Sequence, residues 1–267
     1  MKANLPIQPP PRSSLSGTIV ITVNVLLLSV IPFSFRTSPW AVALAVLLIV
    51  VAARIREMQA FHIALFTAAL TTMPFLHSSF RNWPCNLLIP IIVYFGVVLA
   101  IPLYRKSLLW LRAGRFGEDS LRLVMATAVA SGVALYIWYR TQDPDLSRHL
   151  KYMPDVPAWL YPLVGLGFSV FNAAMEEFVF RGVVMQALDS AFGPDGLSVA
   201  IQAWLFGAGH YREGFPNGGW GLGMTCVYGI MLGTIRRRSQ GMFAPWLAHV
   251  CADMVIFVIL AGIVLRW

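Results

Sequence analysis

The chain has 267 residues, of which 58% are hydrophobic and only 12% are charged, and its mean hydropathy is +0.69. Soluble domains carry about 25% charged residues, so this composition cannot cover a water-exposed surface, and membrane lipid must be the main solvent. The net charge of +8 is compatible with nucleic-acid binding, but the basic residues lie in short loops between apolar runs, which indicates membrane topology and no nucleic-acid partner.

The N-terminal segment differs from the rest of the chain. Residues 1–16 are polar and rich in proline, which predicts a flexible tail. The apolar run behind them ends without a small-residue cleavage site, so it predicts a membrane helix rather than a cleaved signal peptide. We expect N-terminal transmembrane helices over residues 17–120 and C-terminal transmembrane helices over residues 121–267.

Apolar runs of helical length follow one another along the chain, and a helix that crosses the hydrocarbon needs about 20 mostly apolar residues. The runs lie near residues 17–35, 39–53, 59–76, 86–104, 121–139, 158–180, 197–211, 219–235 and 243–265. The second and seventh runs are short, so eight spans is an alternative to nine. The sequence predicts an all-α, polytopic membrane protein with eight or nine transmembrane helices.

The distribution of Lys and Arg predicts the orientation. With the N-terminus inside, thirteen of the twenty basic residues lie on the inner side, which favours a cytoplasmic N-terminus and places the 181–196 and 236–241 loops in the cytoplasm. The absence of large loops favours a prokaryotic cytoplasmic membrane.

Two pairs of glycines recur at helical spacing. Gly219 and Gly223 form one GxxxG step, and Gly229 and Gly233 form another. Small residues at this spacing let helices approach closely in lipid, so we interpret both steps as packing positions.

Ionisable residues gather in the C-terminal apolar runs, where a charge costs roughly 2.5–3.5 kcal/mol on insertion scales. Three acids lie there, Glu176, Glu177 and Asp253, together with His210 and His249. Each residue taken singly is more simply explained as structural, but together they predict a polar centre that packing does not require.

Helical geometry separates the two glutamates. Glu177 and Arg181 are four residues apart, so they can form an ion pair on one helix face. Glu176 points about 100° away, so a structural ion pair leaves it unexplained. His249 and Asp253 are also four apart and share a face, so the aspartate is expected to orient the imidazole or share its proton.

Three motifs occur in a fixed order: Glu176-Glu177-x-x-x-Arg181, Phe206-x-x-x-His210 and His249-x-x-x-Asp253. Their combination resembles the signature of the CAAX protease and bacteriocin-processing family, intramembrane glutamic endopeptidases that include the type II CAAX prenyl endopeptidases. The resemblance covers roughly residues 158–260. It implies a Glu-activated attack of water on a peptide bond, with no cofactor.

The resemblance also implies roles for the motif residues. Glu176 would be the general base, His210 would orient the water, and His249 with Asp253 would stabilise the oxyanion. Many family members have Asn at the position of Asp253, and an ionised aspartate would repel an oxyanion, so Asp253 must be protonated or act by orienting His249.

The remaining motif residues are expected to support the site. Glu177 and Arg181 would form the scaffold pair, with Phe206 beside them. For Glu176 and His210 to reach the membrane depth of His249, the turn near residues 193–196 must project, and we expect Gly182–Phe192 to be an amphipathic end outside the membrane.

Other functions remain open. Two histidines with Glu and Asp could ligate zinc, but no HExxH motif is present. A thiol mechanism through Cys226 or Cys251 is less favoured, and no GxSG serine motif occurs. A proton-coupled carrier also uses intramembrane acids, and a non-catalytic immunity or scaffold protein is a further alternative. The expected partners are membrane lipids and a membrane-associated protein or peptide substrate, whose identity and prenylation the sequence does not define.

Overall fold

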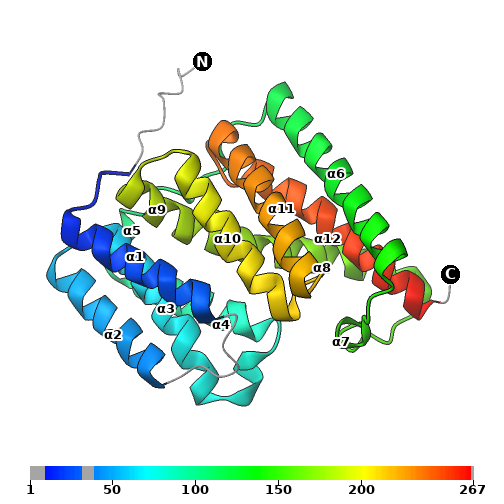
Figure 1. The fold of residues 1–267 in the computed structure, drawn as a ribbon, viewed down its shortest axis with the longest axis horizontal. Helices are drawn as coiled ribbons and strands as arrows, with labels where there is room; N and C mark the ends of the chain where they lie inside the picture. The colour runs from blue at the N-terminus through cyan, green and yellow to red at the C-terminus, as the bar shows by residue number, and fades with distance from the viewer. Residues whose placement is uncertain (1–9, 32–38, 266–267) are drawn as a thin grey trace.

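The computed structural model describes residues 10–31 and 39–265, and its secondary structure is helical (Figure 1). The long helices are α1 (Leu15–Val30), α2 (Pro39–Arg54), α3 (Met58–Leu76), α4 (Cys85–Ala100), α6 (Glu118–Gln142), α8 (Tyr161–Glu177), α9 (Met185–Phe192), α10 (Gly196–Glu213), α11 (Gly218–Ser239) and α12 (Phe243–Val264). The short helical segments are η2 (Ser78–Arg81), α5 (Pro102–Arg105), α7 (Ser147–Leu150), η3 (Ala158–Leu160) and η4 (Phe178–Val184). No strand occurs within these residues, which confirms the all-α class.

Four segments are long and apolar enough to cross a membrane: Met58–Leu76, Glu118–Gln142, Ala158–Phe192 and Phe243–Val264. Helices α1, α2 and α4 are apolar but shorter. Helices α10 and α11, which the sequence also predicts as spans, are long enough but are not apolar enough to be counted with these four segments in the described part of the chain. The structure thus supports an integral membrane protein, and the number of eight or nine spans stays a prediction.

The outer helices expose apolar side chains, as expected for helices that face lipid. On α6, at one edge of the molecule in Figure 1, Leu121, Met125, Val129 and Val133 recur every fourth residue and are all exposed. An apolar stripe of this length on a helix surface is unfavourable in water and favourable against acyl chains.

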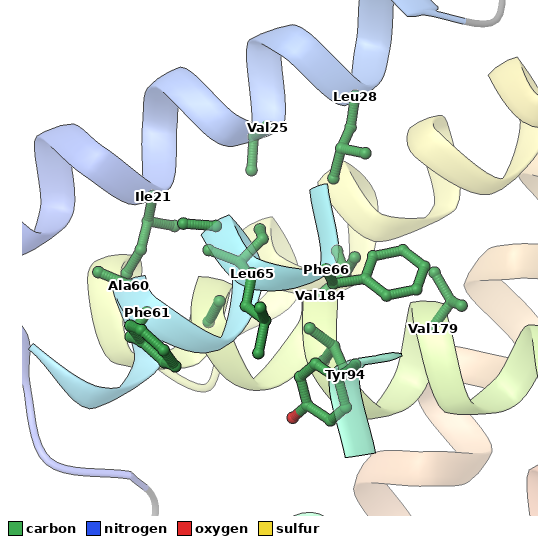
Figure 2. Close-up of a cluster of buried hydrophobic side chains, with 14 of the residues drawn as sticks. Ile21, Val25, Leu28, Ala60, Phe61, Leu65, Phe66, Tyr94, Val179 and Val184 are labelled. Carbon is green, nitrogen blue, oxygen red and sulfur yellow. The ribbon is translucent and has the colours of Figure 1, made fainter. Parts of the chain in front are cut away.

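The main hydrophobic core joins the N-terminal helices to η4, the segment that follows Glu176 and Glu177. Ile21 of α1, Phe66 of α3 and Tyr94 of α4 are buried with Val179 and Val184 of η4, as Figure 2 shows. The helices before residue 100 therefore fix the position of η4, which carries Arg181.

The segment Gly182–Phe192 is helical and does not belong to a loop over residues 181–196, so the predicted loop is wrong over this part. It continues as helix to Phe192, and its polar side chains face protein. The Gln186 amide donates to Gln59 Oε1 at 2.6 Å, and Asp189 pairs with Arg237. Polar side chains in a lipid-solvated protein are satisfied inside the molecule, so their polarity does not mark an exposed end.

The predicted flexible tail is shorter than expected. Ser13 donates its backbone N–H to Ser190 O at 2.9 Å, and the Ser14 hydroxyl caps α1 by accepting from Gly17 N at 3.1 Å. The chain is therefore attached to α9 before α1 begins, and the rest of the predicted tail, residues 1–9, lies outside the described residues.

The two GxxxG steps of α11 have different surroundings. A Cβ on Gly229 would lie 2.9 Å from the Cα of Ala203 in α10, and Gly233 also faces α10 closely, which confirms packing at this step. A Cβ added to Gly219 or Gly223 would have nothing within 4 Å, and both glycines line a cavity instead. The packing interpretation is wrong for these two.

We predict that Gly229→Ala lowers the thermal unfolding midpoint in detergent, because the new methyl group meets the Ala203 backbone. Overpacking of this kind costs about 1–3 kcal/mol. Gly223→Ala is the matched control, since it makes the same change in the same helix where space is open and gains the same helix propensity, about 1 kcal/mol. Equal midpoints for the two variants, followed by circular dichroism, would contradict close packing at Gly229.

Candidate active site

The two glutamates of the first motif end α8, and a π-helical turn follows them. Glu176 and Glu177 are the last two residues of α8, and η4 (Phe178–Val184) continues the helix with π geometry. Such turns are rare and frequently lie at functional sites. This turn carries Arg181 and keeps it beside Glu177.

Glu177 is the centre of a buried ionic chain. Arg181 Nη1 donates to Glu177 Oε1 at 2.9 Å, and the side chains are 0% and 2% exposed, respectively. The same carboxylate oxygen accepts from His249 Nδ1 at 2.8 Å. Arg181 also donates from Nη2 to the carbonyl of Gly229 in α11 at 3.4 Å. One carboxylate thus connects α8 and η4 to α12, and Arg181 connects them to α11.

The other nitrogen of the same imidazole faces the remaining acids. His249 Nε2 lies 3.5 Å from Glu176 Oε2 and 3.8 Å from Asp253 Oδ1. Asp253 is therefore within ion-pair distance of the ring but beyond hydrogen-bonding distance, and its predicted part in orienting the imidazole or sharing its proton stays a prediction. Glu177 orients the imidazole, because the contact between α8 and α12 brings that carboxylate to Nδ1.

Asn172 is a site residue that the sequence analysis missed. Its amide nitrogen donates to Glu176 Oε1 at 3.3 Å and to Asp253 Oδ2 at 3.1 Å, so it bridges the two acids. Trp83 fixes the amide orientation by donating from Nε1 to Asn172 Oδ1 at 2.9 Å. Asn172 precedes Glu176 by four residues, a spacing visible in the sequence, whereas nothing in the sequence indicates Trp83.

Aromatic rings enclose the two histidines. His210 Nδ1 donates to the carbonyl of Phe206 at 2.9 Å, which leaves Nε2 as an acceptor in the neutral ring. The Phe206 ring lies 5.7 Å from that of His249, edge to face, and 4.4 Å from the Arg181 guanidinium carbon. Tyr228 packs edge to face on His249 with ring centres 5.5 Å apart. Phe206 thus supports both the histidines and the ion pair.

A cavity of about 590 Å³ adjoins this cluster. It is formed by α6, α10, α11 and α12, and His210, His249 and Asp253 line it with mostly apolar neighbours. Binding pockets for organic ligands typically measure about 300–1,000 Å³ and combine apolar walls with a few polar groups. Glu176 does not line the cavity itself, but its carboxylate contacts the His249 ring that does.

The described side chains offer no metal-ligand cluster. Among residues 10–31 and 39–265, no three His, Cys, Asp or Glu side chains are arranged to hold a metal ion. The chemistry that the site can perform with its own groups is proton transfer and stabilisation of developing negative charge.

The fold and the site define a helical membrane protein with a buried centre of carboxylates and imidazoles beside an apolar cavity. Residues 157–255 match the model of the type II CAAX prenyl endopeptidase Rce1-like family, and this part of the chain is a domain of that family. The family is one of proteases, so the match supports a membrane-embedded peptidase. No curated protein and no solved structure matches the chain.

We predict that Arg181→Met strongly destabilises the fold, because it leaves the Glu177 carboxylate buried with its cationic partner removed. Breaking a buried ion pair in this way costs about 3–5 kcal/mol. Unfolding midpoints in detergent measure the effect. The double variant Arg181→Met with Glu177→Gln is expected to recover part of the loss, and a single variant as stable as the wild type would contradict the ionic chain.

Proposed function

We propose that the chain is an intramembrane endopeptidase in which Glu176 activates water for attack on a peptide bond. The observation that carries this proposal is the approach of Glu176 to His249, at 3.5 Å, from helices 73 positions apart in sequence, beside a cavity lined by His249 and His210. A general base and a polar group for the oxyanion are the two requirements of such a reaction.

The two oxygens of Glu176 differ in their partners. Oε1 accepts from Asn172, whereas Oε2 is buried and accepts no hydrogen bond from the described residues. Oε2 is therefore the oxygen that takes the proton from water. His210 lines the adjoining cavity and has an acceptor nitrogen in its neutral ring, so we assign it to orient the water through a second hydrogen bond.

His249 is suited to stabilise the oxyanion of the tetrahedral intermediate. Its Nδ1 is held by Glu177, so the ring cannot turn away from the centre. When the ring is protonated on both nitrogens, Nε2–H is a donor fixed in place before the reaction. Donors of this kind are worth about 2.7–4 kcal/mol of transition-state stabilisation in other enzymes.

The charge balance supports a protonated Asp253. Glu176, Glu177 and Asp253 supply three negative charges when ionised, and Arg181 with protonated His249 supplies two positive charges. An unmatched buried charge is costly, so one proton more makes the cluster neutral. Placed on Asp253, this proton turns a group that would repel the oxyanion into a second donor.

The cavity supports a membrane-associated protein or peptide as the substrate, bound through an apolar segment. Gly219, Gly223, Trp220 and Val227 of α11 contribute to its walls. The bias of Lys and Arg supports a cytoplasmic N-terminus, and the short loops support a prokaryotic cytoplasmic membrane.

We predict that Glu176→Gln abolishes cleavage and leaves the unfolding midpoint within a few degrees of wild type, because the amide keeps the shape but cannot accept the proton. Loss of a general base typically costs about 10²–10⁴-fold in rate. Comparison of protein termini in membranes carrying the wild type or the variant identifies the fragment that disappears.

Glu118→Gln is the control for this experiment, since Glu118 is exposed and its ion pair is with Arg122 on the same helix. A scaffold protein would keep its function in Glu176→Gln, and a carrier would lose flux with no cleavage product. Identical sets of termini in wild type and Glu176→Gln would overturn the proposed activity.

We predict that Gly223→Leu lowers kcat/KM about tenfold or more for substrates with a bulky apolar segment, and by a smaller factor for substrates with a small one. The new side chain enters the cavity, and one methylene group in an apolar pocket changes selectivity about 10–200-fold. Gly96→Leu is the control, since Gly96 also has open space but lies on α4, away from the cavity. An unchanged preference in Gly223→Leu would show that substrate binds elsewhere.

A further inference from the structure

A second pocket is bordered by Arg181, the arginine that pairs with Glu177 in the candidate active site. It measures about 180 Å³ and is formed by the segment before α6, by η4 and α9, and by the C-terminal end of α11. Four arginines line it: Arg112, Arg181, Arg236 and Arg237. Asp189 is the single acid among the described residues around it.

The acids available to this pocket do not balance its cations. Arg181 is paired with Glu177. Arg237 forms a two-pronged ion pair with Asp189, with Nη1 to Oδ2 at 2.6 Å and Nη2 to Oδ1.

Arg112 and Arg236 remain without a carboxylate within 4 Å among residues 10–31 and 39–265. Arg112 donates its Nε–H to the carbonyl of Gln240 at 2.9 Å. Burial lowers the pKa of its guanidinium group. Two positive charges in a half-buried pocket are therefore uncompensated.

Unused hydrogen-bond donors accompany the unpaired charge. The Nε atoms of Arg236, Arg237 and Arg181 are buried and find no partner within the described part of the chain. Buried donors normally have partners. Guanidinium groups from several positions around one pocket suit an anion with several acceptor oxygens.

Phosphate has the chemistry that this arrangement selects. Guanidinium groups match the geometry of phosphate oxygens and bind them with charge-assisted hydrogen bonds. About 10–15 Å³ of such space admits one water molecule, so 180 Å³ has room for a phosphate group with some water. The exposed Arg238 lies at the end of α11, and Arg105 and Lys106 lie at the end of α5; lipid phosphates attract basic residues at such helix ends.

We propose that the pocket between α9, α11 and the segment before α6 binds a phosphate group, with Arg112 and Arg236 neutralising it and the guanidinium groups that line the pocket donating to its oxygens. The group is carried by a phospholipid headgroup or by a free phosphate. The site is separate from the proposed peptidase chemistry and does not depend on it.

The test uses the full chain in a maltoside detergent, which contains no phosphate. One arm titrates inorganic phosphate against chloride at equal ionic strength and follows the unfolding midpoint, which rises when a ligand binds the native state. The other arm compares phosphatidic acid with diacylglycerol of the same acyl chains by native mass spectrometry, so that the two ligands differ only in the phosphate.

Arg236→Gln is the informative variant and Arg238→Gln is its matched control, because Arg238 lies two positions further on the same helix end and is exposed outside the pocket. We expect Arg236→Gln to weaken binding about tenfold or more, as for the loss of a hydrogen bond to a charged group, and Arg238→Gln to leave it unchanged. Binding of phosphate in the first arm identifies a free ligand, and selective retention of phosphatidic acid identifies a lipid.

Equal binding by Arg236→Gln and wild type, or equal losses in Arg236→Gln and Arg238→Gln, would overturn the site, as would the absence of binding in both arms. Helical circular dichroism checks that the variant folds. If Arg236→Gln does not fold, Arg112→Gln in the segment before α6 takes its place, with the same expected loss and the same control.

Discussion

The buried carboxylate of Glu177 is the constraint on which the arrangement of the site depends. A carboxylate with 2% exposure is tolerated only when its charge is paired, and Glu177 receives both Arg181 and His249 on Oε1. These partners come from η4 and α12, and Arg181 also reaches the backbone of α11. The need to neutralise one charge therefore holds three helical segments together and turns the free nitrogen of His249 toward Glu176.

Much of this arrangement was predictable from spacing alone, but the choice of partners was not. The spacing of four residues places Arg181 beside Glu177, as the structure confirms. The same rule places Asp253 near His249, yet the imidazole bonds to Glu177 at 2.8 Å and leaves Asp253 at 3.8 Å. Spacing within one helix defines which groups share a face, whereas competition between acids for one imidazole is decided by how α8 packs on α12. Trp83 illustrates the same limit, since it reaches Asn172 across 89 positions.

The fold shows where reading polarity from sequence fails in a lipid-solvated chain. The apolar runs correspond to helices, but the polarity of Gln186 and Asp189 suggests an exposed end, whereas both side chains are buried and paired. In water a polar residue on a helix usually marks the surface, and in lipid it usually marks the interior. The glycines of α11 show a similar ambiguity. The GxxxG pattern indicates that the side chains are small, but it does not indicate whether a neighbouring helix or a cavity requires this. Gly229 admits a neighbouring helix, and Gly223 leaves space for a cavity.

Arg181 borders both the acid-rich centre and the arginine-rich pocket, and the two have opposite excess charge. Glu176, Glu177 and Asp253 outnumber their cationic partners on one side, whereas Arg112 and Arg236 lack acids on the other. Charges interact strongly where water is excluded, so the two groups of opposite charge stabilise each other's positions across Arg181. The same guanidinium donates to Glu177 Oε1 and lines the arginine-rich pocket. The position of Arg181 therefore depends on both surroundings, and a change in either one affects the ion pair with Glu177.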